Sequence, residues 1–127
     1  MNILDFLKNN TPDNKRTAQF KHIRFSKLAG QDVTLTLQSL SFDRLEEIKR
    51  LHGRKSDIYI VLEGVVEPNL KDSALRENYQ VTGYDQLIEK AFTAGEIDNI
   101  SNHILVLSGY GDSSVEELKK NSQSVQD

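Results

Sequence analysis

The chain has 127 residues, a mass of 14.4 kDa and a formal net charge of −3, which fits one domain with its own hydrophobic core. An acidic balance gives no overall attraction to nucleic acid or to an anionic membrane. Cysteine is absent, which excludes disulfides, thiolate zinc sites and a cysteine nucleophile, and no apolar run approaches the roughly 18 residues of a membrane-spanning helix.

Residues 1–18 are expected to form a flexible leader. Its apolar residues stand close together at the start: Ile3, Leu4, Phe6 and Leu7. The remainder is polar and contains Pro12, which is typical of a linker. The four apolar residues are therefore candidates for a partner-binding motif. The plainer alternative is a frayed terminus whose apolar residues rest on the surface.

Residues 19–38 are predicted to form a β-hairpin. In the second arm Val33, Leu35 and Leu37 alternate with polar residues, as in a half-buried strand. The first arm, over 20–28, alternates less cleanly, and residues 29–32 supply the turn. Two strands alone are marginal in water, so helices must cover the apolar face of this hairpin.

The outer edge of the hairpin is a candidate for self-association. An edge strand presents unpaired backbone groups, to which another chain can add a strand. A homo-oligomer formed in this way would use residues of the first arm. The candidate strand-edge residues are Phe20, Ile23 and Phe25.

Helices are predicted to follow the hairpin. Ser41 has the position of an N-cap for a helix that runs to His52, with apolar residues at every third position. Residues 56–67 are apolar nearly all round. Their β-branched residues would also suit a strand, but the length and the capping serine favour a buried helix. Helices over 72–78 and 84–92 come next.

The last predicted helix, over 93–109, has both of its ends specified. Thr93 and Glu96 have the spacing of a capping box, and Gly109 stands where a left-handed C-cap would be. The apolar residues between them recur at steps of three and four, on one face: Ile97, Ile100, Ile104 and Leu107. Because a helix cannot bury such a face alone, segment 56–67 is its expected partner.

These elements predict an α+β fold, mainly α, in which an N-terminal β-hairpin packs on a bundle of about five short helices. Residues 19–110 would form a single globular domain. Residues 111–127 are polar and are expected to form a partly disordered tail, with one or two helical turns over 114–120.

We predict no catalytic residue, cofactor site or metal site. The three histidines, His22, His52 and His103, do not stand at metal-ligand spacing, and neither a Gly-rich phosphate loop nor a nucleophile elbow is present. Glu63 and Glu67 could share a helix face, where two buried carboxylates can perform acid–base chemistry. A solvated stripe is the favoured interpretation, so we expect a protein that is not an enzyme.

Five basic residues fall within thirteen positions that contain no acidic residue: Lys15, Arg16, Lys21, Arg24 and Lys27. Two phenylalanines lie among them, as in faces that bind nucleic acid. In an acidic chain such scattered charges would give weak, salt-sensitive binding at most. We favour a solvated strand face whose charges oppose aggregation, and nucleic-acid binding is the less favoured alternative.

Four stretches resemble the XkdN-like family of phage tail assembly chaperones, found in tailed phages and in prophages of Gram-positive bacteria. They are a Phe-Leu-x-x-Asn leader over 3–10, a strand-to-helix step over 40–45, a Pro-Asn-Leu-Lys-Asp segment within 66–79, and Gly-Glu-Ile followed by Leu-Ser-Gly-Tyr within 92–110. Order and spacing carry the resemblance. Asp43 and Arg44 depart from the acidic residue usual at the second stretch.

The resemblance implies a non-catalytic chaperone in the bacterial host cytoplasm that binds and solubilises the tape measure protein during tail morphogenesis. Its expected partner would be that protein, and the tail tube protein would be a second candidate partner. Many members exist in two lengths through a translational frameshift, and the polar tail of this chain suits the short form. Another phage structural adaptor or a protein-interaction scaffold is the alternative reading of the same residues.

Overall fold

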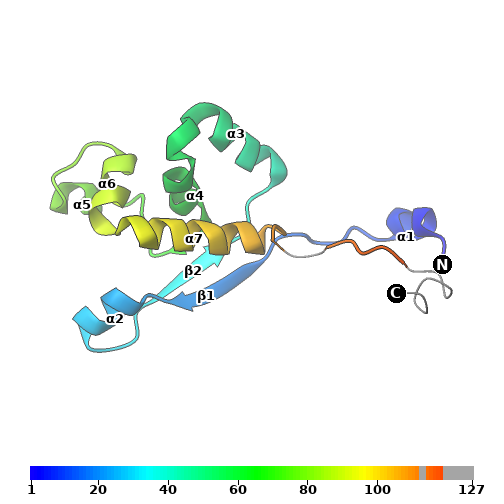
Figure 1. Ribbon diagram of the computed structural model, residues 1–127, viewed down its shortest axis with the longest axis horizontal. Coiled ribbons are helices and arrows are strands. Elements are labelled where there is room, and N and C mark those ends of the chain that lie inside the picture. Colours follow the sequence, from blue (N-terminus) through cyan, green and yellow to red (C-terminus); the bar gives the residue numbers. More distant parts are fainter. Residues whose placement is uncertain (112–113, 119–127) are drawn as a thin grey trace, which may run out of the picture.

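The computed structural model describes residues 1–111 and 114–118. The elements are α1 (Ile3–Asn9), β1 (Thr17–Lys21), α2 (Ile23–Ala29), β2 (Thr34–Gln38), α3 (Phe42–His52), the short 3-10 helix η1 (Gly53–Lys55), α4 (Ser56–Gly64), β3 (Val65–Glu67), α5 (Ser73–Asn78), α6 (Tyr84–Ala91) and α7 (Ala94–Leu107). The fold is α+β and mainly α, as predicted. Figure 1 shows α7 between the sheet and the α3–α4 pair, with α5 and α6 at one end.

The sheet has three antiparallel strands in the order β1-β2-β3. The predicted pairing of the two N-terminal strands is confirmed, with Ala18 opposite Leu37 and Phe20 opposite Leu35. Leu35 and Leu37 point into the core, and α7 covers this face of β2. The helices thus cover the apolar face that two strands could not bury alone.

The connection between the first two strands differs from the predicted turn. Ile23 and Phe25 lie on helix α2, so the prediction that they belong to a strand edge is wrong. The cause is His22, whose side chain accepts the N–H of Phe25 at 3.0 Å and so acts as an N-cap. Gly30 ends the helix in the left-handed conformation, with φ 73°.

The segment predicted as one helix over 56–67 divides into α4 and β3. The helix ends at Gly64, and the next residues pair with β2. Two adjacent valines and the following Pro68 favour extended chain at this point. Glu63 therefore lies on a helix and Glu67 on a strand, and the two do not share a helix face as the sequence had suggested.

Helix α3 begins and ends where predicted, since the Ser41 side chain accepts the N–H of Arg44. Only two of the four regularly spaced apolar residues of this helix are buried. Leu45 and Ile48 are buried, whereas Phe42 and Leu51 at the two ends are largely exposed. The helix therefore packs through its middle turns, and both of its ends leave apolar surface in solvent.

Helix α7 carries the predicted capping box. Thr93 Oγ1 accepts the N–H of Glu96 at 3.2 Å, and Glu96 Oε1 accepts the N–H of Thr93 at 2.9 Å. Ile100, Ile104 and Leu107 are buried, and α4 is the element packed most closely on this face, as expected. The C-terminal turn closes through backbone hydrogen bonds from residues 109 and 110 to residues 106 and 105, the pattern of a Schellman motif.

The ends of the chain differ in detail from the predicted boundaries. β1 begins at Thr17, two residues before the expected start of the globular part. Residues 114–118 contain no helix, so the predicted helical turn is wrong for that stretch. Residues 119 and 120, and the tail over 121–127 that we expected to be disordered, lie outside the described residues.

Candidate functional site

Helix α1 presents the apolar leader residues together. Asn2 Oδ1 accepts the N–H groups of Leu4 and Asp5, which caps the helix at its start. The four apolar side chains are 37–64% exposed, and no residue of α1 is buried: Ile3, Leu4, Phe6 and Leu7. Figure 1 shows this helix apart from the rest of the fold. A helix of this length is marginal in water, so a partner surface would stabilise it.

The predicted strand-edge residues are not brought together. Phe20 remains on β1, where it is half-buried with its ring 4.4 Å from that of His103. Ile23 is 59% exposed at the start of α2, and Phe25 points inward toward the sheet and α6. Phe20 alone therefore stands on the strand where an added chain would pair.

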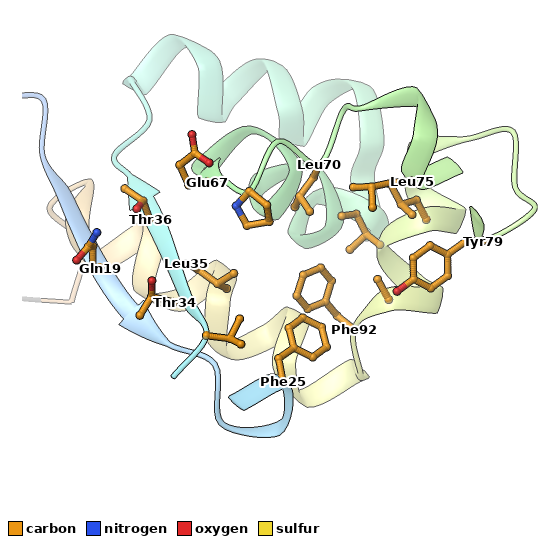
Figure 2. Close-up of a pocket in the computed structure, with 15 residues that line it drawn as sticks. Gln19, Phe25, Thr34, Leu35, Thr36, Glu67, Leu70, Leu75, Tyr79 and Phe92 are labelled. Atoms are coloured by element: carbon orange, nitrogen blue, oxygen red, sulfur yellow. The ribbon is translucent and has the colours of Figure 1, made fainter. Parts of the chain in front are cut away.

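A second surface, which the sequence did not reveal, is an apolar groove of about 500 Å³ between the sheet, α2 and the α5–α6 region. Figure 2 shows strand β2 along one wall, with Leu70, Leu75 and Tyr79 along the other. We refer to this feature as the β2 groove. Its lining residues are Gln19, Phe25, Val33, Thr34, Leu35, Thr36, Glu67, Pro68, Leu70, Leu75, Tyr79, Leu87, Ile88, Ala91 and Phe92.

Aromatic rings form the end of the β2 groove near α2. The Phe25 ring stacks on His22 at 3.7 Å between centroids and lies 5.5 Å from the ring of Phe92. His22 Nδ1 accepts the backbone N–H of Phe25, and its Nε2 lies 3.3 Å from Glu96 Oε2. The histidine thus serves as a cap and a packing surface.

Backbone groups of β2 face the β2 groove at Thr34. In an antiparallel pair, hydrogen-bonded positions alternate with positions whose N–H and C=O point to the other side. His22 donates to the carbonyl of Val33, so the backbone of Thr34, the next residue, points away from β1. On that side β3 ends at Glu67, which lies opposite Thr36. The strand position beside Thr34 is therefore empty among the described residues.

An ion pair holds the α2 wall in place. Arg24 donates to both carboxylate oxygens of Glu96, at 2.9 and 2.8 Å, and to the carbonyl of Ala91 at 3.1 Å. The pKa of Glu96 is lowered from 4.5 to about 2, mainly because of these hydrogen bonds from Arg24. The N–H of Thr93 and the nearby His22 lower this pKa further, whereas burial opposes the shift. The bidentate contact joins α2 to the start of α7.

A second ionic cluster joins α3, α4 and the segment after β3. Glu63 on α4 accepts from Arg44 at 2.6 Å and from Lys71 at 3.3 Å, and Arg44 also pairs with Glu47. Burial alone would raise the pKa of Glu63, but the hydrogen bonds from Arg44 and Lys71 outweigh it and lower that pKa. The cluster fixes the segment after β3, which leads into the second wall of the β2 groove.

The acid-free basic stretch is partly neutralised by the fold. Lys21 lies 3.1 Å from Asp32, and Arg24 is paired with Glu96. Two of its five charges therefore have acidic partners, and Arg24 and Lys27 lie on helix α2 and not on the predicted strand face.

Within residues 1–111 and 114–118, no three His, Cys, Asp or Glu side chains gather closely enough to hold a metal ion. Over the same residues, no helix has the length and apolar character needed to cross a membrane.

Comparison with known proteins identifies the family. The sequence model of the phage XkdN-like tail assembly chaperone proteins matches residues 49–121, more than half of the chain. A search of curated proteins gave no match. The crystal structure of the protein yqbn, a structural genomics target, has a similar fold with a TM-score of 0.62 at 22% identity, over 83% of this chain and 93% of that one. The chain belongs to the XkdN-like family of phage tail assembly chaperones.

Proposed function

We propose that this chaperone binds the tape measure protein and keeps it soluble while the tail is assembled in the host cytoplasm. It acts by non-covalent binding and catalyses no reaction. The tail tube protein is a possible second partner, because tube subunits polymerise around the same client. Membership of the family supports a role in tail assembly. The exposed apolar residues of the leader support binding to a client through apolar contacts.

The observation that carries this proposal is the apolar stripe of α1. Ile3 and Leu7 are separated by one helical turn, and Leu4 and Phe6 flank them, so all four share one broad side of the helix. A short amphipathic helix on a polar linker can dock its apolar side in a groove of another protein. It would reach a client without disturbing the folded part of the chain.

Co-expression with the candidate client tests the proposal. The tape measure protein encoded in the same phage genome is expressed with and without this chain, and its soluble fraction and co-purification are measured. We expect rescue by the wild type and loss of rescue when the four leader residues are changed to serine. A matched variant replaces exposed apolar residues on the folded part, Leu51→Ser and Val106→Ser, and should still rescue.

Two results would contradict the proposal. A client that stays insoluble with this chain and with any longer frameshifted product would point to a structural adaptor instead. Equal rescue by the leader variant would retain the chaperone function but remove α1 from its binding surface.

We also propose that the outer edge of β1 permits self-association. β1 is an edge strand, and the register directs the backbone of Gln19 away from β2. Proline at position 19 removes an outward N–H and leaves the β1–β2 hydrogen bonds in place. Sedimentation should show a concentration-dependent increase in mass for the wild type and a smaller one for Gln19→Pro. A strictly monomeric wild type would refute this mode of assembly.

A further inference from the structure

We propose that the β2 groove binds an extended apolar polypeptide segment, which adds to the sheet beside β2 as a short extra strand. The occupant we infer has aliphatic side chains at alternate positions and a basic residue near one end. Backbone pairing, side-chain packing and charge each support this occupant independently.

The backbone of Thr34 supplies the pairing. Its N–H and C=O point toward the side on which β3 would continue, but the chain turns away after Glu67. Pro68 has no N–H and cannot extend the ladder. A segment that enters here would form main-chain hydrogen bonds with β2 in the manner of other strand-addition sites. Figure 2 shows Thr34 on β2 across the β2 groove from Leu75 and Tyr79.

The lining of the β2 groove supplies the packing. The walls and floor are mostly aliphatic and aromatic, and the volume of about 500 Å³ lies in the usual range for binding pockets. Alternate side chains of an added strand point to opposite faces of the sheet. Those on the inner face would contact Leu75, Ile88 and Phe92, whereas those on the outer face would lie with the polar side chains of Thr34 and Thr36.

Charge complementarity indicates which end of the bound segment carries a basic residue. Glu67 is the one ionisable carboxylate among the lining residues, and it makes no ion pair with the described part of the chain. It lies where β3 stops, at the entrance to the strand position beside Thr34. A lysine or arginine at that end of the occupant would pair with Glu67, which favours one direction of binding.

The inference rests on the proposed function only for the identity of the natural occupant, an extended segment of the client. Binding itself is tested with a synthetic probe, so that the two proposals can fail separately. The probe is a soluble heptapeptide in which valine and threonine alternate after an N-terminal lysine. A second peptide has the same sequence with N-methyl groups on alternate backbone nitrogens, which removes donors without removing apolar side chains.

The experiment is a titration of the full chain followed by amide chemical shifts. We expect the probe to move the amide signals of residues 33–36, Glu67, Asn69 and Leu70, and the N-methylated peptide to bind at least tenfold more weakly. Leu75→Lys, which places a charge in the β2 groove, should also reduce affinity at least tenfold, whereas Leu51→Lys on α3 should not change it. Glu67→Gln should reduce affinity about threefold at low salt, with the difference lost at high salt.

Three outcomes would overturn the inference. One is equal binding of the two peptides, because strand addition needs the backbone donors. Another is unchanged binding by Leu75→Lys. The third is movement of the same amides when the protein alone is concentrated, which would make a second copy of the chain the occupant. Failure of the proposed function would appear differently, as peptide binding that survives while the tape measure protein stays insoluble.

Discussion

Gly64 and Ile104 fit together because the glycine has no side chain. A Cβ atom built at Gly64 would lie 2.4 Å from Cδ1 of Ile104, closer than two carbon atoms can approach. Gly64 is the last residue of α4, and Ile104 is fully buried in the last turn of α7. The two helices are therefore in close contact where one lacks a side chain and the other fills the space.

This contact predicts a compensating pair of substitutions. Ile104→Ala should destabilise the fold by about 2–5 kcal/mol through the cavity it leaves. Gly64→Ala should cost about 1–3 kcal/mol through overpacking. The double variant should lose less than the sum, because each change relieves the other. Urea unfolding of the four proteins measures the coupling, and strict additivity would show that the helices separate instead of repacking.

Deletion of residues 1–10 is expected to leave the folded part intact. No residue of α1 is buried, and its polar hydrogen bonds are all within the leader. The free energy of unfolding should change by less than about 0.5 kcal/mol, as for other surface changes. Urea unfolding of the deleted and full chains tests this, and a larger loss would mean that the leader packs on the domain in solution.

The low pKa of Glu96 predicts acid sensitivity in a defined interval. In the unfolded chain this carboxyl takes up a proton near pH 4.5, whereas in the fold it stays ionised down to about pH 2. As the pH falls between these values, the unfolded state binds a proton that the native state does not, so stability decreases. Above pH 4.5 the full contribution is present.

The measurement is unfolding by urea at several pH values from 2 to 7. Glu96→Gln should lower stability at neutral pH and flatten its decrease below pH 4.5. Glu77→Gln is a matched control, because Glu77 makes no ion pair among the described residues and should keep the wild-type slope. An unchanged slope in Glu96→Gln would assign the acid sensitivity to other carboxylates.

Ser108→Ala is predicted to destabilise the junction between α7 and the segment before α3. Ser108 Oγ accepts the N–H of Leu40 at 2.9 Å and donates to the carbonyl of Ile104 at 2.8 Å. Leaving a half-buried N–H without a partner costs about 1–3 kcal/mol. Thermal unfolding should show this loss, whereas Ser73→Ala at an exposed position should have little effect. Equal stability of the two variants would indicate that water replaces the hydroxyl.

The best-predicted helices are those whose ends are encoded locally. Ser41, Thr93 and Glu96 satisfy backbone groups within one turn, so their roles follow from neighbouring residues alone. α2 was missed because its N-cap is a histidine, which is outside the usual set of Ser, Thr, Asp and Asn. The first arm was therefore predicted as a longer strand, although its alternation is less clean than that of the second arm.

β3 and the β2 groove depend on contacts between distant parts of the chain. The apolar run over 56–67 is locally compatible with helix or strand, and pairing with β2 decides where one becomes the other. The β2 groove is built from residues spread between Gln19 and Phe92. No local pattern marks such a surface, whereas the apolar cluster of the leader was visible because its residues are adjacent, although the helix that they form was not predicted.

The strand order also determines when the molecule becomes complete during its synthesis. β1, α2 and β2 leave the ribosome first, but β3 and the second wall of the β2 groove follow only after α3 and α4. A nascent chain that ends before Phe92 therefore displays the apolar leader while its β2 groove is still unbuilt. The two surfaces of this small protein thus emerge at different times.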